Sequence, residues 1–375
     1  MDGFCVEPGG MGMTEKLSLG IRIGDIEVKP ATALAPMEGI TDAMFRRAIR
    51  RCGGCGITVT EFVNCEGLAR DVGKVWEKAL PGADERPSSI QIYGRQPERI
   101  AKAAAMCEAR GAQIIDLNLG CPAKQVVSGN AGCALMKEPE LCCEIFKQVR
   151  AAIQIPMTVK MRLGWNMHQL NALEIAKMAQ EEGASMIAVH GRTREEAYRG
   201  HSHWEMIKPI SEALSIPVLV NGDILTRGDA RVALEQSGAA GIMVGRGLLR
   251  NPWLLRQIDD EIAGRPVYEP TLNERLEFVC KYMDDVQKLP ISASGAVGKI
   301  KCFLGFFTRG LKYSSQMRER AYRFMTMDEI RNAITEYFHA LEEDQQQSVF
   351  DSVEYEDNQE RFRDGDPRRC DSVTI

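Results

Sequence analysis

Residues 157–191 read MTVKMRLGWNMHQLNALEIAKMAQEEGASMIAVHG, and this stretch carries the pattern that decides the fold. An apolar run at 157–163 is followed by residues 171–182, in which apolar side chains recur every three or four positions, and then by a second apolar run at 186–191. Short apolar runs rich in β-branched residues are typical of buried strands, and the longer spacing is typical of an amphipathic helix. The stretch therefore predicts a strand–helix–strand unit with parallel strands.

The same unit repeats between residues 31 and 247. Eight strand-like runs occur there, at residues 31–37, 57–62, 88–93, 113–119, 157–163, 186–191, 217–223 and 240–245. Helical patterns lie between most of them, at residues 97–110, 139–152, 171–182, 204–214 and 226–236. Eight alternating units predict an α/β fold of the (β/α)8 TIM-barrel type, with an open doubly wound sheet as the alternative on counting alone.

The segments on either side of the barrel follow other patterns. Residues 21–29 (IRIGDIEVK) predict a hairpin that turns at Gly24-Asp25 and covers or plugs the bottom of the barrel. After Pro266 and Pro270, residues 271–341 show helical spacing and no strand-like run. We therefore divide the chain into an N-terminal extension (1–20), a barrel (21–262), a small all-helical domain (271–341) and a tail (342–375).

Composition excludes several classes of protein. The chain has 375 residues, 44% of them hydrophobic, which suits one barrel with an appendage. No apolar run approaches the roughly 18 residues of a membrane span. The N-terminus lacks the basic segment and apolar core of a signal peptide. We expect a cytoplasmic protein that does not enter membranes.

Charge is distributed unevenly along the chain. The net charge is −5, but residues 342–375 contain eleven acidic and four basic residues, so the body of the protein is slightly positive. The tail is polar and has no apolar periodicity, which is typical of disorder. A negative overall charge therefore does not exclude an anionic partner for the body.

The twelve cysteines are scattered, and several of them lie in apolar patterns. We expect Cys107, Cys133, Cys142 and Cys143 to be buried thiols of a cytosolic chain, without a disulfide framework. Cys52 and Cys55 form one CxxC with no second pair near it, and Cys65 stands alone. His201 and His203 form at best a weak pair. No metal site is expected.

Polar or reactive groups stand at the ends of nearly all the strand-like runs. Active sites of (β/α)8 barrels lie at these carboxyl ends, although any single polar residue there can simply face water. The groups are Pro36-Met37-Glu38, Glu61, Gln91, Asn118 and Cys121, Lys160 and Arg162, His190 and Arg192, Asn221 and Asp223, and Gly245-Arg246.

Three of these groups indicate the chemistry but leave it open. The glycine-containing ends VNGDI (220–224) and VGRGLL (244–249) suit a phosphate. Lys160 is a cation in the middle of a buried strand, so it needs an anionic partner such as the N1–O2 edge of a reduced flavin, or it forms a Schiff base. Cys121, on a Gly-Cys-Pro turn, can act as nucleophile, metal ligand or proton donor, or it is a small buried apolar residue.

Taken together, the motifs resemble the tRNA-dihydrouridine synthases, most closely the bacterial B-type branch. The resemblance runs in order through residues 21–341. It rests on APMEGITD (35–42), QIYG (91–94), DLNLGCP (116–122), VKMRLGW (159–165), VHGRT (189–193), NGDI (221–224) and GRG (245–247). It implies an FMN-binding barrel followed by a helical domain that grips tRNA.

The resemblance also implies a role for each position. Cys121 matches the catalytic acid, and Asn118 and Arg162 match groups that face the uracil. The cofactor-binding positions are Pro36, Met37, Glu38, Gln91, Lys160, His190, Asn221, Gly222, Asp223, Gly245 and Arg246.

The reaction that the resemblance implies is the reduction of specific uridines in tRNA to dihydrouridine. NADPH, or alternatively NADH, reduces FMN; the flavin N5 delivers hydride to C6 of a flipped-out uracil, and Cys121 protonates C5. A thiol suits the last step because its ordinary pKa of roughly 8.5 keeps it protonated at neutral pH. We expect a monomer without a metal ion.

Two basic clusters are candidates for the RNA contact. Residues 295–325 hold seven basic side chains and one acidic one, interleaved with Phe303, Phe306, Phe307, Tyr313 and Tyr322. The second cluster is Arg46, Arg47, Arg50 and Arg51. The alternative interpretation is that the aromatic residues form a helix-bundle core and the charges a solvated face. We hypothesise that the acidic tail competes with RNA for the basic face.

Two other functions compete with the one that the resemblance implies. The first is a flavin barrel enzyme for a free small molecule, such as a dihydroorotate dehydrogenase or an ene-reductase; the basic C-terminal domain argues against it. The second is a tRNA-binding protein without catalysis. Cys121, Lys160 and the glycine-containing strand ends argue against that one.

Overall fold

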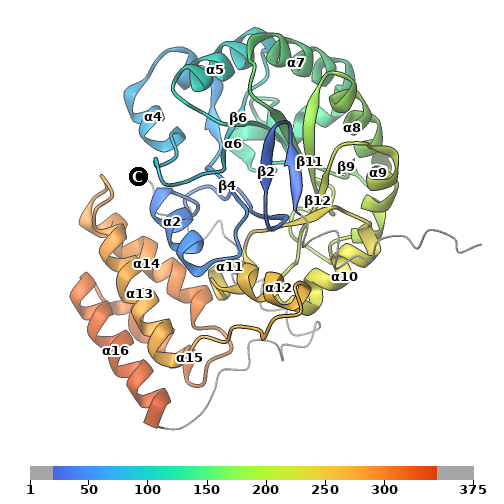
Figure 1. Ribbon diagram of the computed structural model, residues 1–375. Helices are drawn as coiled ribbons and strands as arrows, with labels where there is room; N and C mark the ends of the chain where they lie inside the picture. Colours follow the sequence, from blue (N-terminus) through green and yellow to red (C-terminus); the bar gives the residue numbers. More distant parts are fainter. Residues whose placement is uncertain (1–19, 344–375) are drawn as a thin grey trace, which may run out of the picture.

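The computed structural model describes residues 20–343, and its central feature is a closed barrel of parallel strands (Figure 1). The strands follow one another in space as β4-β3-β13-β12-β11-β8-β7-β6, and pairing of Thr58 with Ser88 joins β6 back to β4. This closure confirms the predicted (β/α)8 barrel and rules out the open sheet. The barrel strands are β3 (Thr32–Leu34), β4 (Ile57–Val59), β6 (Ser88–Tyr93), β7 (Ile115–Leu119), β8 (Met157–Arg162), β11 (Ala184–His190), β12 (Val218–Asn221) and β13 (Gly241–Val244).

Helices surround the strands and bury their apolar faces against them (Figure 1). They are α2 (Ala43–Cys52), α3 (Cys65–Ala69), α4 (Gly73–Ala79), α5 (Pro97–Ala109), α6 (Lys124–Val127), η1 (Gly132–Lys137), α7 (Pro139–Ala152), α8 (Ala172–Glu181), η2 (Trp204–Ile207), α9 (Lys208–Ala213), α10 (Arg227–Ser237), α11 (Gly247–Arg250) and α12 (Leu254–Ile262). Two small strand elements interrupt the pattern: β5 (Val63–Asn64) pairs along β6, and β9 (Gly164–Asn166) with β10 (Gln169–Leu170) forms a hairpin after β8.

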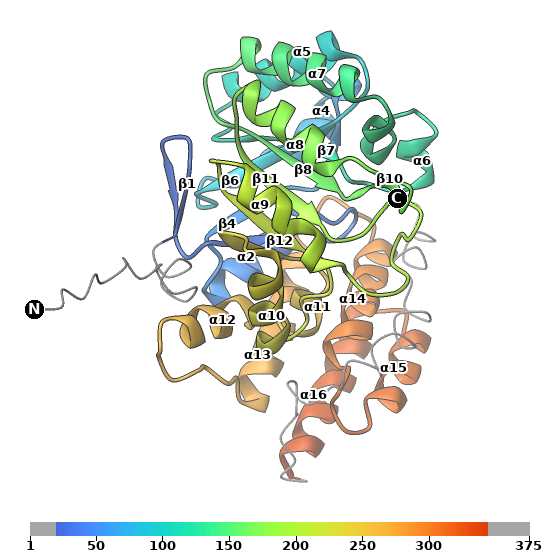
Figure 2. The same ribbon diagram turned by 90° about the vertical axis from the view of Figure 1, so that its right-hand side faces the viewer.

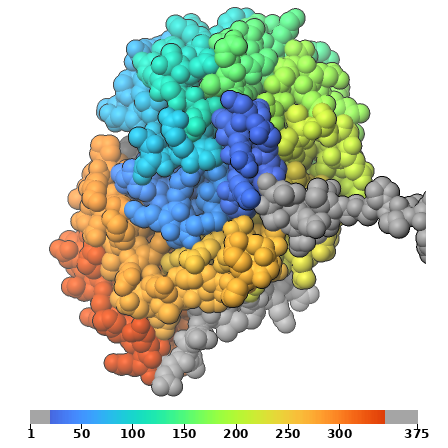
Figure 3. Space-filling view, viewed as in Figure 1, coloured from blue at the N-terminus to red at the C-terminus, as the bar shows by residue number. Residues whose placement is uncertain are grey.

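The predicted N-terminal hairpin is confirmed. It consists of β1 (Ile21–Ile23) and β2 (Ile26–Val28), and it covers the centre of the face seen in Figure 3. Ile23 and Val28 are fully buried. Gly24 at the turn lies so close to Pro156, just before β8, that a Cβ there would be 2.7 Å from the proline ring. The hairpin therefore closes the barrel at the amino ends of the strands.

The chain after the barrel is helical, as predicted. Thr271 and Glu274 form a capping box that starts α13 (Leu272–Val286), and α14 (Ala293–Phe307), α15 (Ser314–Arg323) and α16 (Met327–Glu343) follow. Figure 2 shows these helices beside the barrel, with α14 and α15 on the side away from the N-terminal hairpin. Glu342 and Glu343 extend α16; the other residues of the predicted tail, and residues 1–19, lie outside the described chain.

The aromatic residues of this helical region divide into two groups. Phe303, Phe306 and Phe307 are buried, and the rings of Phe303 and Phe307 stack 5.1 Å apart. Tyr313 and Tyr322, in contrast, are 52% and 64% exposed. The core interpretation is therefore right for the three phenylalanines, and the two tyrosines are the exposed rings of this set.

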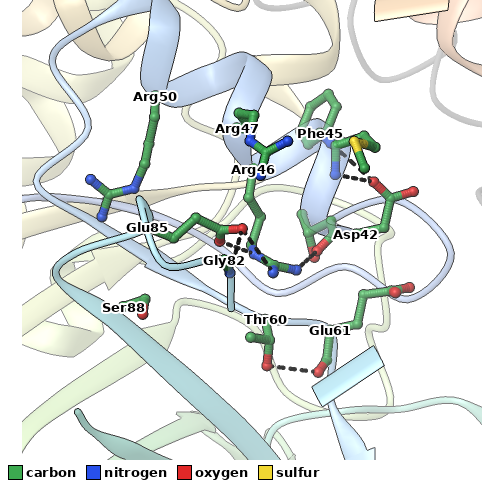
Figure 4. Close-up of polar contacts among 12 residues, drawn as sticks. Asp42, Phe45, Arg46, Arg47, Arg50, Thr60, Glu61, Gly82, Glu85 and Ser88 are labelled. Carbon is green, nitrogen blue, oxygen red and sulfur yellow. Dashed lines mark hydrogen bonds and ion pairs between the residues drawn. The ribbon is translucent and has the colours of Figure 1, made fainter. Parts of the chain in front are cut away.

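The arginine cluster of α2 does not form a free basic face. Arg46 is buried and makes an ion pair of 2.6 Å with Glu85, which is equally buried (Figure 4). Arg50 donates to the backbone carbonyls of Arg86 and Pro87. Arg47 and Arg51 pair with Asp84 and Asp285. The interpretation as a solvated face is wrong for Arg46, which is buried, whereas Arg47 and Arg51 are partly exposed in their ion pairs. Contact of this cluster with RNA stays a prediction.

We expect Glu85→Gln to lower the free energy of unfolding by about 3 kcal/mol, because it leaves the Arg46 charge buried without a counter-charge. Urea unfolding followed by circular dichroism measures this difference. Asp84→Asn is the matched control: it removes the neighbouring but exposed Arg47–Asp84 pair and should cost about 1 kcal/mol or less. Equal losses in the two variants would contradict the prediction.

Other sequence expectations concern thiols, metals and membranes. Nine of the ten cysteines between residues 20 and 343 are free thiols; Cys107, Cys133 and Cys142 are buried, and Cys143 is half-buried. In this part of the chain, no three His, Cys, Asp or Glu side chains are grouped to hold a metal ion. From Gly20 to Glu343, no helix has the length and apolar character needed to cross a membrane.

Candidate active site

A cavity of about 580 Å³ opens at the carboxyl ends of the barrel strands. Its size is typical of a site for a cofactor or a small ligand. All fourteen site residues that the sequence predicts line this cavity: Pro36, Met37, Glu38, Gln91, Asn118, Cys121, Lys160, Arg162, His190, Asn221, Gly222, Asp223, Gly245 and Arg246. Residues spread over more than two hundred positions meet because parallel strands bring their carboxyl ends to one face.

A chain of buried hydrogen bonds fixes the turn that carries Cys121. Asn118, at the end of β7, accepts from the backbone N–H groups of Gly120 and Cys121 at 3.0 and 2.9 Å. Its own amide donates to Gln91 Oε1 at 2.8 Å, and Gln91 Nε2 donates to Asp116 at 2.6 Å. The second carboxylate oxygen of Asp116 accepts from Thr158. Asp116 thereby fixes the orientation of both amides, and through them the Cys121 turn.

Cys121 is a half-buried free thiol in the wall of the cavity. Burial raises its pKa, and the nearby Glu38 carboxylate raises it further; a backbone N–H at Ala123, Arg162 and Lys160 act in the opposite direction. A thiol with a raised pKa holds its proton at neutral pH, which suits an acid better than a nucleophile. The contacts of Cys121 therefore favour proton donation among the three chemical roles left open.

Two cations face the thiol from β8. Burial and the charge of Arg162 lower the pKa of Lys160 to about 8, so its ammonium remains mostly charged at neutral pH. Arg162 is buried and donates to three carbonyls, those of Gly120, Thr193 and Ala197, each at 2.9 Å. Carbonyls orient a guanidinium without neutralising it, so Arg162 keeps its positive charge in this part of the cavity.

His190 lies at the end of β11 among these cations. Burial lowers its pKa well below the ordinary range, and Arg162, Lys160, Arg192 and Arg246 lower it further. The imidazole is therefore neutral, so it can accept a hydrogen bond from a ligand as well as donate one.

The far end of the cavity is organised around Asp223. Its carboxylate accepts two bonds from Arg192, at 2.9 and 2.5 Å, and one from Arg246 at 3.2 Å. Gly222 allows close packing beside it, because a Cβ there would lie 2.3 Å from Ser202 Oγ and 2.8 Å from the ring of His190. Two arginines against one carboxylate leave an excess positive charge, which suits a phosphate.

The helical region also contributes to the cavity. Phe306 of α14 lies in its wall, and Tyr198, from the loop after β11, lines it as a partly exposed ring. The guanidinium of Arg246 is 4.9 Å from the Tyr198 ring centre. Sequence reasoning did not identify Asp116, Phe306 or Tyr198 as site residues, and it noted Arg192 only as a strand end. Two signals were available: Asp116 is an acid inside an apolar strand motif, and Tyr198 follows the VHGRT motif.

Comparison with known proteins identifies the relatives of this chain. The family model described as dihydrouridine synthase matches residues 33–350. A probable tRNA-dihydrouridine synthase of Rickettsia conorii is 38% identical over 325 residues, which cover 86% of this chain and 98% of the relative. A tRNA-dihydrouridine synthase B of Pasteurella multocida is 37% identical over 269 residues, covering 72% of this chain and 81% of that protein.

Solved structures with the same fold are more distant in sequence. A 2-naphthoyl-CoA reductase complex aligns with a TM-score of 0.53 and 13% identity, covering 88% of this chain and 70% of the other. Histamine dehydrogenase from Rhizobium sp. 4-9 gives the same TM-score at 12% identity, over 92% of this chain and 68% of its own. These two similarities support the barrel fold alone.

Proposed function

Because the chain belongs to the dihydrouridine synthase family, we propose that it uses FMN and NADPH to reduce the C5–C6 double bond of uridines in tRNA. The observation that carries the proposal is the placement of a protonated thiol, Cys121, in one cavity with the ammonium of Lys160 and the guanidinium of Arg162. This set combines a proton donor with cations that stabilise negative charge on the substrate.

The cavity fits FMN in its volume and its charges. Gly245 and Met37 line the cavity side by side, since a Cβ on Gly245 would lie 3.4 Å from the methionine sulfur, in ordinary van der Waals contact. We assign the phosphate to the end that holds Gly222 and Arg246, and the flavin ring to the part lined by Met37, Gln91 and Lys160. When bound and reduced by NADPH, FMN supplies the hydride that C6 of the uracil receives.

Cys121 then completes the reduction by giving its proton to C5. The raised pKa keeps the thiol protonated until it is needed, and the Asn118 side chain holds the backbone of the Cys121 turn. Lys160 and Arg162 stabilise the enolate-like charge that develops on the uracil before this proton arrives. Because Arg162 is buried and held by three backbone carbonyls, it needs little reorganisation during the reaction.

The helical region is the proposed contact for the body of the tRNA. Arg320 and Arg323 are 58% and 76% exposed on α15, and the exposed rings of Tyr313 and Tyr322 lie at the start and near the end of the same helix. Exposed cations neutralise phosphates, and exposed rings stack on unpaired bases. A uridine in a loop costs less to flip into the cavity than a paired one.

The test is an assay with tRNA that lacks dihydrouridine. The purified protein with its bound flavin is incubated with this tRNA and NADPH, or with NADH, and dihydrouridine is mapped along the RNA. We expect product only when tRNA and a nicotinamide donor are both present. Absence of product from flavin-loaded protein would overturn the proposal, and equally fast reduction of free uridine or orotate would favour the small-molecule flavin enzyme.

A further inference from the structure

One basic residue of the helical region faces the barrel and not the solvent. Lys299 of α14 places its ammonium 2.6 Å from Asp42 Oδ2, and it donates to the carbonyl of Gly39 at 2.7 Å. The side chains of Lys299 and Asp42 are only 14% and 17% exposed. Lys299 therefore directs its charge at the loop that follows β3 and not at the solvent.

The peptide groups of Gly39 are held from two directions. Its carbonyl accepts from Lys299, and its N–H donates to the buried carboxylate of Glu61, which lies just beyond β4. Figure 4 shows the side chains of Asp42 and Glu61 together on the right of the view, on the side of Arg46 away from Glu85. Gly39 has φ +71°, a conformation that favours glycine. The loop thus has one defined shape, set by a barrel residue and a helical-region residue together.

This loop leads directly into the cavity. Pro36, Met37 and Glu38 line the cavity immediately before Gly39, and the backbone of Met37 is tied to the side chain of Thr41. Glu38 accepts a hydrogen bond of 3.0 Å from Gln125, which lies four residues after Cys121. The Lys299–Gly39 contact therefore lies next to Glu38, and the hydrogen bond between Glu38 and Gln125 joins residues 36–39 to the loop that carries Cys121.

We propose that Lys299 is a positioning residue that holds residues 36–39 against the cavity, so that it sets how firmly the flavin is retained and how the Cys121 loop is placed. This inference rests on the proposed function. It gives the helical region a second role, because the same domain that is proposed to bind tRNA also completes the flavin site.

Electrostatics explain why a cation is needed at this point. Burial raises the pKa of Glu61, whereas Lys78 and Lys299 lower it and Asp42 raises it. Without Lys299, the Asp42 and Glu61 carboxylates repel each other with only Lys78, 3.6 Å from Glu61, to compensate. The loop relaxes in response, because only the hydrogen bond from Gly39 N–H to Glu61 then holds the peptide groups of Gly39.

The experiment compares three variants of the flavin-loaded protein. Lys299→Met removes the charge but keeps most of the apolar side chain. Asp42→Asn removes the partner charge and keeps the cap of α2, because asparagine caps a helix as well as aspartate does. Lys301→Met is the matched control: Lys301 lies on the same helix and donates to the carbonyl of Tyr322, away from the loop at residues 36–39. Flavin release is followed by the rise in free-flavin fluorescence after dilution.

We expect flavin release to be about tenfold faster in Lys299→Met and in Asp42→Asn, the size of effect that loss of one charge-assisted hydrogen bond produces. The double variant should be no worse than either single one. In the tRNA assay both variants should lower kcat, and Lys299→Arg should restore most of it, whereas Lys301→Met should raise KM for tRNA and leave flavin release unchanged.

The opposite pattern would overturn the inference. If Lys299→Met raises only KM for tRNA, as Lys301→Met does, Lys299 is an ordinary RNA-binding cation. If Lys299→Met does not fold, Asp42→Asn decides by the same flavin-release measurement. If flavin retention depends on Lys299 but the wild-type protein forms no dihydrouridine, the inference stands and the proposed substrate is wrong. If the wild-type protein binds no flavin, both proposals are wrong.

Discussion

Replacing Cys121 by alanine is expected to slow dihydrouridine formation by about two to four orders of magnitude, the usual contribution of one general acid. Reduction of the bound flavin by NADPH should keep its wild-type rate, because that step needs no proton from the thiol. Stopped-flow absorbance measures the first half-reaction, and single-turnover mapping of dihydrouridine measures the second. Cys121→Ser should be nearly as slow as the alanine variant, since an alcohol is a far weaker acid than a thiol.

Cys133 provides the matched control. It is a second free thiol, fully buried, and its backbone N–H donates to the carbonyl of Cys121 at 3.2 Å. Cys133→Ala keeps that backbone bond and removes only the sulfur, so product formation should stay within about twofold of wild type, with a loss of stability on the order of 1 kcal/mol. Full product formation by Cys121→Ala would remove the thiol from the mechanism.

The barrel could be predicted from the sequence because its signals are local. The apolar runs at 157–163 and 186–191 become β8 and β11, and the intervening helical pattern becomes α8, each within about two residues. The candidate site could be predicted for a related reason. Once the strands are known to be parallel, Cys121, Lys160 and Asn221 must lie at the same end of the barrel, whatever the details of packing.

The residues that escaped prediction depend on contacts between distant segments. Asp116 points at Gln91 on the neighbouring strand, and nothing in the motif DLNLGCP says which of its polar residues are structural. Lys299 looks like any other cation of a basic helix until its contact with Asp42 is seen. The pairing of the α2 arginines escaped prediction for the same reason: a linear count of charges cannot reveal that Glu85 pairs with Arg46 and Asp285 with Arg51.

Replacing Lys160 by methionine is expected to lower the rate of dihydrouridine formation by about two to three orders of magnitude, comparable to the loss of one preorganised charge at an oxyanion site. Lys160 lies on β8 beside Asn118 of β7, and in the proposed reaction its ammonium stabilises the charge that develops on the uracil. Lys208→Met, which removes an exposed cation paired with Glu212 on the outer helix α9, should leave the rate unchanged.

The pH dependence distinguishes Lys160 from Cys121. Both groups act in the protonated form, so activity falls as pH rises through whichever pKa is lower. Lys160 has a pKa lowered to about 8, whereas the pKa of Cys121 is raised from its ordinary value. The wild-type rate should therefore begin to fall near or somewhat above pH 8, since an anionic ligand beside Lys160 moves its pKa upward.

Variants at Lys160 show which group causes this fall. The rate of Lys160→Met should be low but independent of pH up to the pKa of Cys121, the higher of the two. Lys160→Arg should retain part of the rate, and the pH at which its rate falls should also move up to the pKa of Cys121, because arginine stays charged. Single-turnover rates of the pre-reduced protein from about pH 6.5 to 9.5 measure both effects. The Schiff-base alternative would instead be supported if Lys160→Arg is inactive and borohydride traps the substrate on Lys160 of the wild-type protein, because only an amine can form that adduct.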